Sequence, residues 1–147
     1  MRLSLQVHYA ICGIFDLAYN GQGEPVQVRV IGERQQIPTR YLEQIFQRLR
    51  RADLVTGKRG PGGGYTLARP AARISVRDIV EAIEGPIGGA PQFSGEDASP
   101  YRPDFAWSEL ALRLAQALET VTIEALCRRA AQAAVRRDQA HSYTYQI

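Results

Sequence analysis

The chain has 147 residues, a length that fits one domain or one small domain with an appendage. Its composition is ordinary for a globular protein, and no apolar run approaches the roughly 18 residues of a membrane span. The first residues contain neither an uninterrupted apolar core nor a small-residue cleavage site. We therefore expect no signal peptide and a cytoplasmic protein. The two cysteines, Cys12 and Cys127, are far apart in the sequence and are expected to be reduced.

The formal net charge of +3 is unevenly distributed. Residues 1–70 carry 10 Lys and Arg against 5 Asp and Glu, whereas residues 71–147 carry 8 against 10. Between residues 40 and 59, six cations face only two acidic side chains. This excess indicates a polyanion partner for the N-terminal half, although a solvated helix face is the commoner origin of such a charge run.

Helical periodicity predicts a first helix that Ser4 caps and that runs to about Tyr19. The next segment, residues 26–31, is ambiguous. Its alternation of apolar and polar residues is typical of a strand, yet a short helix also fits. Gly32 would weaken that helix by about 1 kcal/mol relative to alanine, and the pattern leaves both interpretations open.

Residues 38–52 give a clearer helical pattern, with Pro38 in the expected first turn. The apolar stripe has the i, i+3, i+4, i+7 spacing and consists of Leu42, Ile45, Phe46 and Leu49. The other side of this helix carries amide, carboxylate and guanidinium groups. These are the side chains that read base edges and hold phosphates.

A glycine-rich hairpin is predicted directly after this helix, over residues 54–67. Lys58 and Arg59 are expected at its tip, where glycines let the backbone approach a phosphate backbone closely. A solvated turn is the simpler interpretation of the hairpin alone. The order of helix, short helix, polar-faced helix and basic hairpin is, however, that of a winged helix-turn-helix.

The C-terminal half is expected to be helical. Ser75 begins a helix that ends at Gly85, and residues 85–104 form a flexible Gly/Pro-rich loop. A wide apolar seam predicts a helix from Phe105 to about Val121, and Thr122 begins another helix that runs to about Arg137. The tail at residues 141–147 could add a short strand, dock on a partner subunit or be frayed.

Several short matches share one pattern: residues 1–4, 9–10 and 49–50, residues 41–46 (Tyr-Leu-Glu-Gln-Ile-Phe), and above all residues 58–65 (Lys-Arg-Gly-Pro-Gly-Gly-Gly-Tyr). On these residues the chain resembles the bacterial Rrf-two family of IscR-like regulators. The resemblance covers residues 1–85 closely and 105–127 loosely. It implies that residues 28–35 form the first helix of the helix-turn-helix and that the helix from Phe105 crosses a partner's copy. Many such turns have glycine where this chain has Gln36. Either Gln36 adopts positive φ at a cost of about 1 kcal/mol, or the turn differs slightly in this chain.

The expected fold is therefore mostly α with a small β-hairpin wing. Residues 1–84 would form the winged helix-turn-helix domain and 105–147 the dimerisation helices and tail. A helix folded onto its own domain is the alternative to dimerisation. The contacts expected in the dimer are Trp107, Leu110, Ala111, Leu114, Leu118 and Val121.

The resemblance implies a homodimeric, sequence-specific DNA-binding transcription regulator, expected to be a repressor. A two-fold dimer would read a pseudo-palindromic site in double-stranded DNA. The expected DNA contacts are Arg2, Thr39, Arg40, Tyr41, Glu43, Gln44, Arg50, Lys58, Arg59, Gly60, Gly62 and Gly63.

An iron–sulfur cluster of the IscR type is not expected. Members that hold one have three closely spaced cysteines in the segment that corresponds to residues 85–106, which here contains no cysteine and no histidine. An alternative is an intersubunit metal or cluster site at His8, Cys12 and Cys127, or a redox-sensing thiol at either cysteine. A partly buried histidine and two core thiols are the simpler interpretation.

No catalytic residues and no enzyme are predicted. The glycines are not followed by the Gly-Lys-Ser/Thr of a phosphate-binding loop, and neither histidine has a spaced acidic partner. The alternative function is a sensory regulator that acts through a protein partner, bound by the winged fold, by residues 85–104 or by the tyrosine-rich tail.

Overall fold

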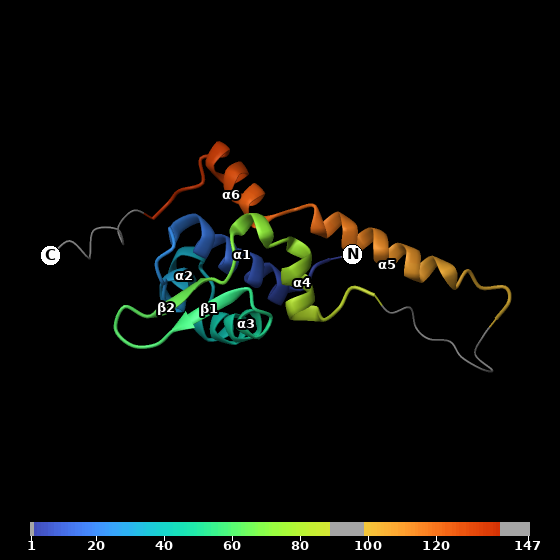
Figure 1. Ribbon diagram of the computed structural model, residues 1–147, viewed down its shortest axis with the longest axis horizontal. Helices are drawn as coiled ribbons and strands as arrows, with labels where there is room; N and C mark the ends of the chain where they lie inside the picture. Colours follow the sequence, from blue (N-terminus) through green and yellow to red (C-terminus); the bar gives the residue numbers. More distant parts are fainter. Residues whose placement is uncertain (1, 89–98, 139–147) are drawn as a thin grey trace.

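The computed structural model describes residues 2–88 and 99–138. In these ranges the elements follow one another as α1 (Leu5–Asn20), α2 (Val28–Gln35), α3 (Thr39–Arg51), β1 (Val55–Lys58), β2 (Gly64–Leu67), η1 (Ala71–Arg73), α4 (Val76–Glu84), α5 (Phe105–Glu119) and α6 (Ile123–Gln132). Figure 1 shows α1 to α4 and the hairpin gathered into one body, from which α5 projects to one side. The expected fold class, a mostly helical winged helix-turn-helix, is confirmed. None of the helices in the described ranges has the length and apolar character needed to cross a membrane.

Helix α1 lies at the centre of this body. Ser4 caps it, with its hydroxyl oxygen accepting a hydrogen bond from the Val7 N–H at 3.2 Å. The apolar stripe of α1 is buried against α3 and α4. At Gly13 a methyl group would lie 2.8 Å from the ring of Phe46 on α3, so a glycine lets the two helices pack closely.

Residues 26–31, for which the sequence allowed either a strand or a helix, contain an extended residue followed by a helix. Val26 pairs with Tyr65 of β2 through two backbone hydrogen bonds of 2.9 and 2.8 Å, and α2 begins two residues later at Val28. The turn after α2 contains Gln36 at φ 55° and ψ 44°. Gln36 thus adopts positive φ, the first of the two possibilities that the sequence left open, at a position where glycine would be unstrained.

The wing is a two-stranded antiparallel sheet in which Val55 is opposite Leu67 and Lys58 is opposite Gly64. Lys58 is therefore the last residue of β1, and the loop starts at Arg59. At Gly64, φ is +139° and a Cβ would lie 2.4 Å from the Val26 carbonyl group. Glycine is thus required where the wing meets the segment before α2.

The C-terminal half is joined to the body at the starts of α4 and α6. Ser75 and Asp78 form a capping box on α4, and Thr122 caps α6. The two caps lie side by side, because Val76 N–H bonds Val121 O at 2.8 Å and Ile123 N–H bonds Ile74 O at 2.9 Å.

Two helix ends differ from the sequence-based expectation. Helix α5 ends at Glu119 rather than at about Val121, and α6 ends at Gln132 rather than near Arg137. The α6 helix stops early because Ala134 adopts φ 56° and the Val135 N–H bonds Ala130 O at 2.9 Å. This is the left-handed turn that ends many helices. Residues 89–98 of the predicted loop and the predicted tail, 141–147, lie outside the described residues.

Candidate nucleic-acid interface

The exposed side of α3 carries a stripe of four polar side chains. These residues have the i, i+4, i+7, i+11 spacing and are all exposed: Arg40, Gln44, Gln47 and Arg51. The opposite stripe of the helix, from Leu42 to Leu49, is buried in the core. Gln47 and Arg51 were absent from the predicted contacts, although their helical spacing to Arg40 and Gln44 would have identified them.

The stripe is flanked by further predicted contacts. Tyr41 is 42% exposed, and Arg40 lies over its ring with the guanidinium carbon 4.7 Å from the centroid. Arg40 Nη2 also donates to Tyr41 Oη at 2.9 Å. Glu43 and Arg50 are exposed near the other edge, and Thr39 is half-buried. The N-terminal part of α3 thus presents the Arg40 guanidinium and the Tyr41 phenol on one side of the stripe and the Glu43 carboxylate on the other.

Arg48 belongs to a different surface from the stripe. Its Nη1 donates to Gln6 Oε1 at 3.0 Å and to the carbonyl oxygen of Ile83 at 3.4 Å. Arg48 therefore ties α3 to α1 and to the end of α4. Of the six cations between residues 40 and 59, Arg48 therefore makes hydrogen bonds within the protein.

The wing lies beside α3 (Figure 1) and leaves Lys58, Arg59, Gly60 and Gly62 exposed. Gly63 is buried, and its N–H donates to Gly60 O at 2.9 Å, so this predicted contact closes the turn of the hairpin. Arg2 is exposed before α1, and Figure 1 places the N-terminus away from the wing loop.

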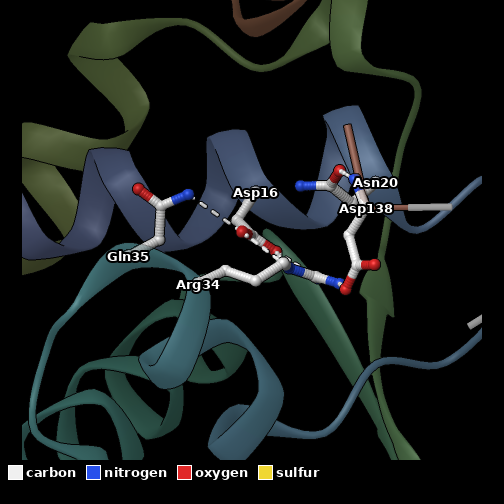
Figure 2. A network of polar contacts seen from close by, with 5 residues as sticks. All are labelled: Asp16, Asn20, Arg34, Gln35 and Asp138. Carbon is white, nitrogen blue, oxygen red and sulfur yellow. Dashed lines mark hydrogen bonds and ion pairs between the residues drawn. The ribbon is translucent and has the colours of Figure 1, made fainter. Parts of the chain in front are cut away.

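A buried ion pair fastens the first helix of the helix-turn-helix to α1 (Figure 2). Asp16 on α1 is fully buried and accepts from Arg34 Nε at 3.1–3.2 Å and from Gln35 Nε2 at 2.9 Å. Arg34 Nη1 lies 3.1 Å from a carboxylate oxygen of Asp138. Burial disfavours the charged guanidinium, but the hydrogen bonds and charges of Asp16 and Asp138 outweigh it and raise the pKa of Arg34.

The three candidate metal ligands do not form a ligand set within one chain. His8 is exposed, whereas Cys12 and Cys127 are half-buried against the core. Across residues 2–88 and 99–138, no three His, Cys, Asp or Glu side chains are close enough together to hold a metal ion. An iron–sulfur cluster therefore does not fit these residues within a single chain.

The surroundings of both thiols raise their pKa values. Burial, with the nearby charge of Asp16, raises the pKa of Cys12. Burial also raises the pKa of Cys127, and Glu124 adds to this effect while Arg137 opposes it. Because the thiolate is the reactive form, neither cysteine has the lowered pKa of a redox sensor.

The predicted dimer residues, five on α5 and Val121 just after it, leave much apolar surface uncovered. Trp107 is 40% exposed, Leu110 57% and Val121 37%, whereas Ala115, outside the predicted set, packs inward. The other three predicted contacts, Ala111, Leu114 and Leu118, are half-buried. A projecting helix with such a face is typical of an interaction surface.

The chain is similar to known proteins along most of its length. The family model Rrf2, described as an iron-dependent transcriptional regulator, matches residues 3–129. A Neisseria meningitidis protein named as a helix-turn-helix-type transcriptional regulator is 39% identical over 129 residues, covering 86% of this chain and 87% of that protein. IscR of Xenorhabdus nematophila is 36% identical over 130 residues, covering 86% of this chain and 79% of IscR.

Two solved structures share the fold. CymR, the global cysteine regulator of B. subtilis, has a TM-score of 0.71 at 30% identity, covering 88% of this chain and 98% of CymR. IscR of T. potens has a TM-score of 0.70 at 31% identity, covering 97% of this chain and 96% of that one. These relatives are regulators of transcription and not enzymes. The chain therefore belongs to the Rrf2 (Rrf-two) family and is an IscR-like, DNA-binding transcriptional regulator.

Proposed function

We propose that the protein is a homodimer that recognises a pseudo-palindromic operator, with α3 in the major groove and the wing along the neighbouring backbone or minor groove. The observation that carries this proposal is the exposed stripe of Arg40, Gln44, Gln47 and Arg51 beside a basic, glycine-rich wing. A surface of this shape and charge suits a groove lined by phosphates.

The side chains of α3 supply both kinds of base readout. Arginine makes two hydrogen bonds to guanine, and glutamine makes two to adenine. Arg40 and Gln44 are near the N-terminal end of α3, the part that contacts base edges in helix-turn-helix proteins. Glu43 would accept a hydrogen bond from cytosine and repel other bases at that position.

The remaining predicted contacts would hold phosphates and so set the register on the duplex. Thr39 and Arg50 flank the α3 stripe, and Lys58, Arg59 and the exposed glycines Gly60 and Gly62 belong to the wing. Gly63 would support this surface through the turn that its N–H closes. Arg2 would reach a phosphate further from the wing.

The test measures binding of alanine variants to an operator selected with the wild-type protein. Arg59→Ala should weaken binding by roughly 1–3 kcal/mol. Glu43→Ala should relax base preference more than it weakens affinity. Arg128→Ala and Glu124→Ala, both exposed on α6, are matched controls that should leave base preference unchanged and shift affinity at most slightly. If the α3 and wing variants behave like these controls, the proposed docking is wrong.

Dimerisation is proposed through the uncovered face of α5, because its apolar side chains need a partner. Each subunit would then present its α3 to one half-site. We propose repression as the outcome, by occupation of an operator in the cytoplasm. A reporter gene behind the selected operator should lose expression when the protein is present, and increased expression would contradict this.

We further propose that the protein works without an IscR-type cluster, since residues 85–106 contain no cysteine or histidine. Iron analysis of anaerobically purified protein should give only background levels. A brown sample with stoichiometric iron would contradict the proposal and would favour the alternative intersubunit site at His8, Cys12 and Cys127.

A further inference from the structure

The segment that follows α6 turns back onto the body of the protein. Ala134 takes a left-handed conformation, φ 56°, which is unfavourable for a residue with a Cβ. The turn brings Val135 O within 2.8 Å of the hydroxyl of Tyr19, a residue that is 4% exposed near the end of α1. The guanidinium carbon of Arg137 lies 4.4 Å from the centroid of the same ring. Several contacts thus offset the strain of the turn.

Asp138 joins this segment to two helices at once (Figure 2). Its backbone N–H donates to Asn20 Oδ1 at the end of α1, at 2.8 Å. Its carboxylate pairs with Arg34 Nη1 on α2 at 3.1 Å, and both side chains are largely buried, with exposed fractions of 25% and 15%. The Nε and Nη2 groups of Arg34 are already bound to the buried Asp16. Asp138 therefore binds the remaining end of the guanidinium.

Helix α2 depends on such contacts because its own sequence supports it weakly. It has eight residues, no side-chain bond at its N-cap Gln27, a glycine at position 32 and the strained Gln36 at its C-cap. Isolated helices of this length are unstable in water, so tertiary contacts determine where α2 lies. The polar contacts from Arg34 are part of that support.

We propose that residues 133–138 form a C-terminal latch that holds α2 against α1, and that Arg34 and Asp138 are positioning residues for DNA binding. This inference rests on the proposed function. It means that the segment after α6, which itself follows the proposed dimer helix, contacts α1 at Tyr19 and Asn20 and contacts α2, the first helix of the DNA-reading motif, at Arg34. The orientation of that motif then depends on the C-terminal half of the same chain.

The variant Asp138→Ala tests the proposal against simple electrostatics. The substitution removes a negative charge, so electrostatics alone predicts tighter binding to the DNA polyanion. The latch predicts the opposite, a loss of operator affinity of about fivefold or more. Glu124→Ala, which removes the same charge from an exposed position on α6, should bind as tightly as wild type or slightly more tightly. Asp138→Glu should restore part of the affinity.

A second measurement does not require DNA. Hydrogen exchange of the free protein should speed up in α2 for Asp138→Ala, and for Tyr19→Phe, which removes only the hydroxyl that Val135 binds. Exchange in α3 and α4 should stay unchanged, which separates loosening of α2 from a general loss of stability.

Unchanged exchange in α2, or affinity equal to that of Glu124→Ala, would overturn the latch. If wild type binds no selected operator, the proposed function fails, and the exchange result still decides whether the latch exists.

Discussion

Gln36 holds the turn between α2 and α3 in a left-handed conformation, and its side chain is exposed. The comparison with other helix-turn-helix turns raised this conformation as one possibility and a slightly different turn as the other, and the structure has the first. Asp16 and Arg34 show the opposite case. They are 18 residues apart and resemble ordinary surface charges in the sequence. Only the packing of α1 against α2 buries Asp16 fully and brings Arg34 into an ion pair with it.

Gln36→Gly should stabilise the protein by about 0.5–1 kcal/mol, since glycine adopts positive φ without steric cost. The free energy of unfolding in urea measures this. Gln47→Gly is the matched control, an exposed glutamine inside α3 with helical geometry, and should lower stability by about 0.5–1 kcal/mol. Destabilisation by both substitutions would show that Gln36 is unstrained.

The cysteines should react slowly with iodoacetamide at neutral pH, because their raised pKa values keep the thiolate scarce. The rate should keep increasing through about pH 8.5, where an unperturbed thiol begins to level off. Urea-unfolded protein provides the control. A folded-state rate at pH 7 that exceeds the unfolded rate would revive the redox-sensing alternative for Cys12 or Cys127.

At the scale of elements, the connection between wing and helix-turn-helix explains why one segment looked ambiguous. Val26 is extended because it pairs with Tyr65, and Val28 is helical because α2 packs on α1 and α3. The alternating pattern of residues 26–31 contains both signals. Partner strands that lie 39 positions away cannot be inferred from that pattern, whereas α3 and the hairpin could be predicted because their periodicity and turn residues are local.

Gly64→Ala should detach the wing from Val26, because the added methyl group meets backbone atoms at 2.4 Å and φ is +139°. A loss of stability on the order of 1–3 kcal/mol is expected, together with weaker operator binding. Gly57→Ala, in the paired strand, is the control. Its Cβ would meet only the Tyr65 ring at 3.4 Å or more, an ordinary contact. Equal stability and equal operator affinity of the two variants would mean that the contact of Gly64 with Val26 does not support the wing.

At the scale of the whole molecule, α5 extends away from the body (Figure 1). Several of its large apolar side chains, including Trp107 and Leu110, are exposed. The sequence predicted the α5 helix and its apolar seam, because apolar residues that recur every three or four positions indicate an amphipathic helix. It did not predict that the chain after α6 returns to α1 and α2, since that path depends on the turn at Ala134 and on contacts across 104 to 118 residues.

Leu110→Glu should dissociate the proposed dimer. Each lost leucine contributes about 2 kcal/mol of burial, and a two-fold interface counts it twice, so the dimer should weaken roughly a thousandfold. Leu112→Glu is the matched control: it is 58% exposed against 57% for Leu110, and it points about 200° away around α5. Analytical ultracentrifugation reads the outcome. A monomeric wild type, or a dimeric Leu110→Glu variant, would contradict dimerisation through this face.

The central claim, that α3 and the wing read DNA directly, is tested most directly by a salt titration of wild-type binding to the selected operator and to a scrambled duplex. If six or more phosphates are contacted, affinity should decrease by about 10³-fold or more between 50 and 200 mM salt. The operator should remain the tighter ligand at every salt concentration. Binding that is independent of salt would contradict the account and favour a regulator that acts through a protein partner. Equal binding to the two duplexes at every salt concentration would contradict sequence-specific reading.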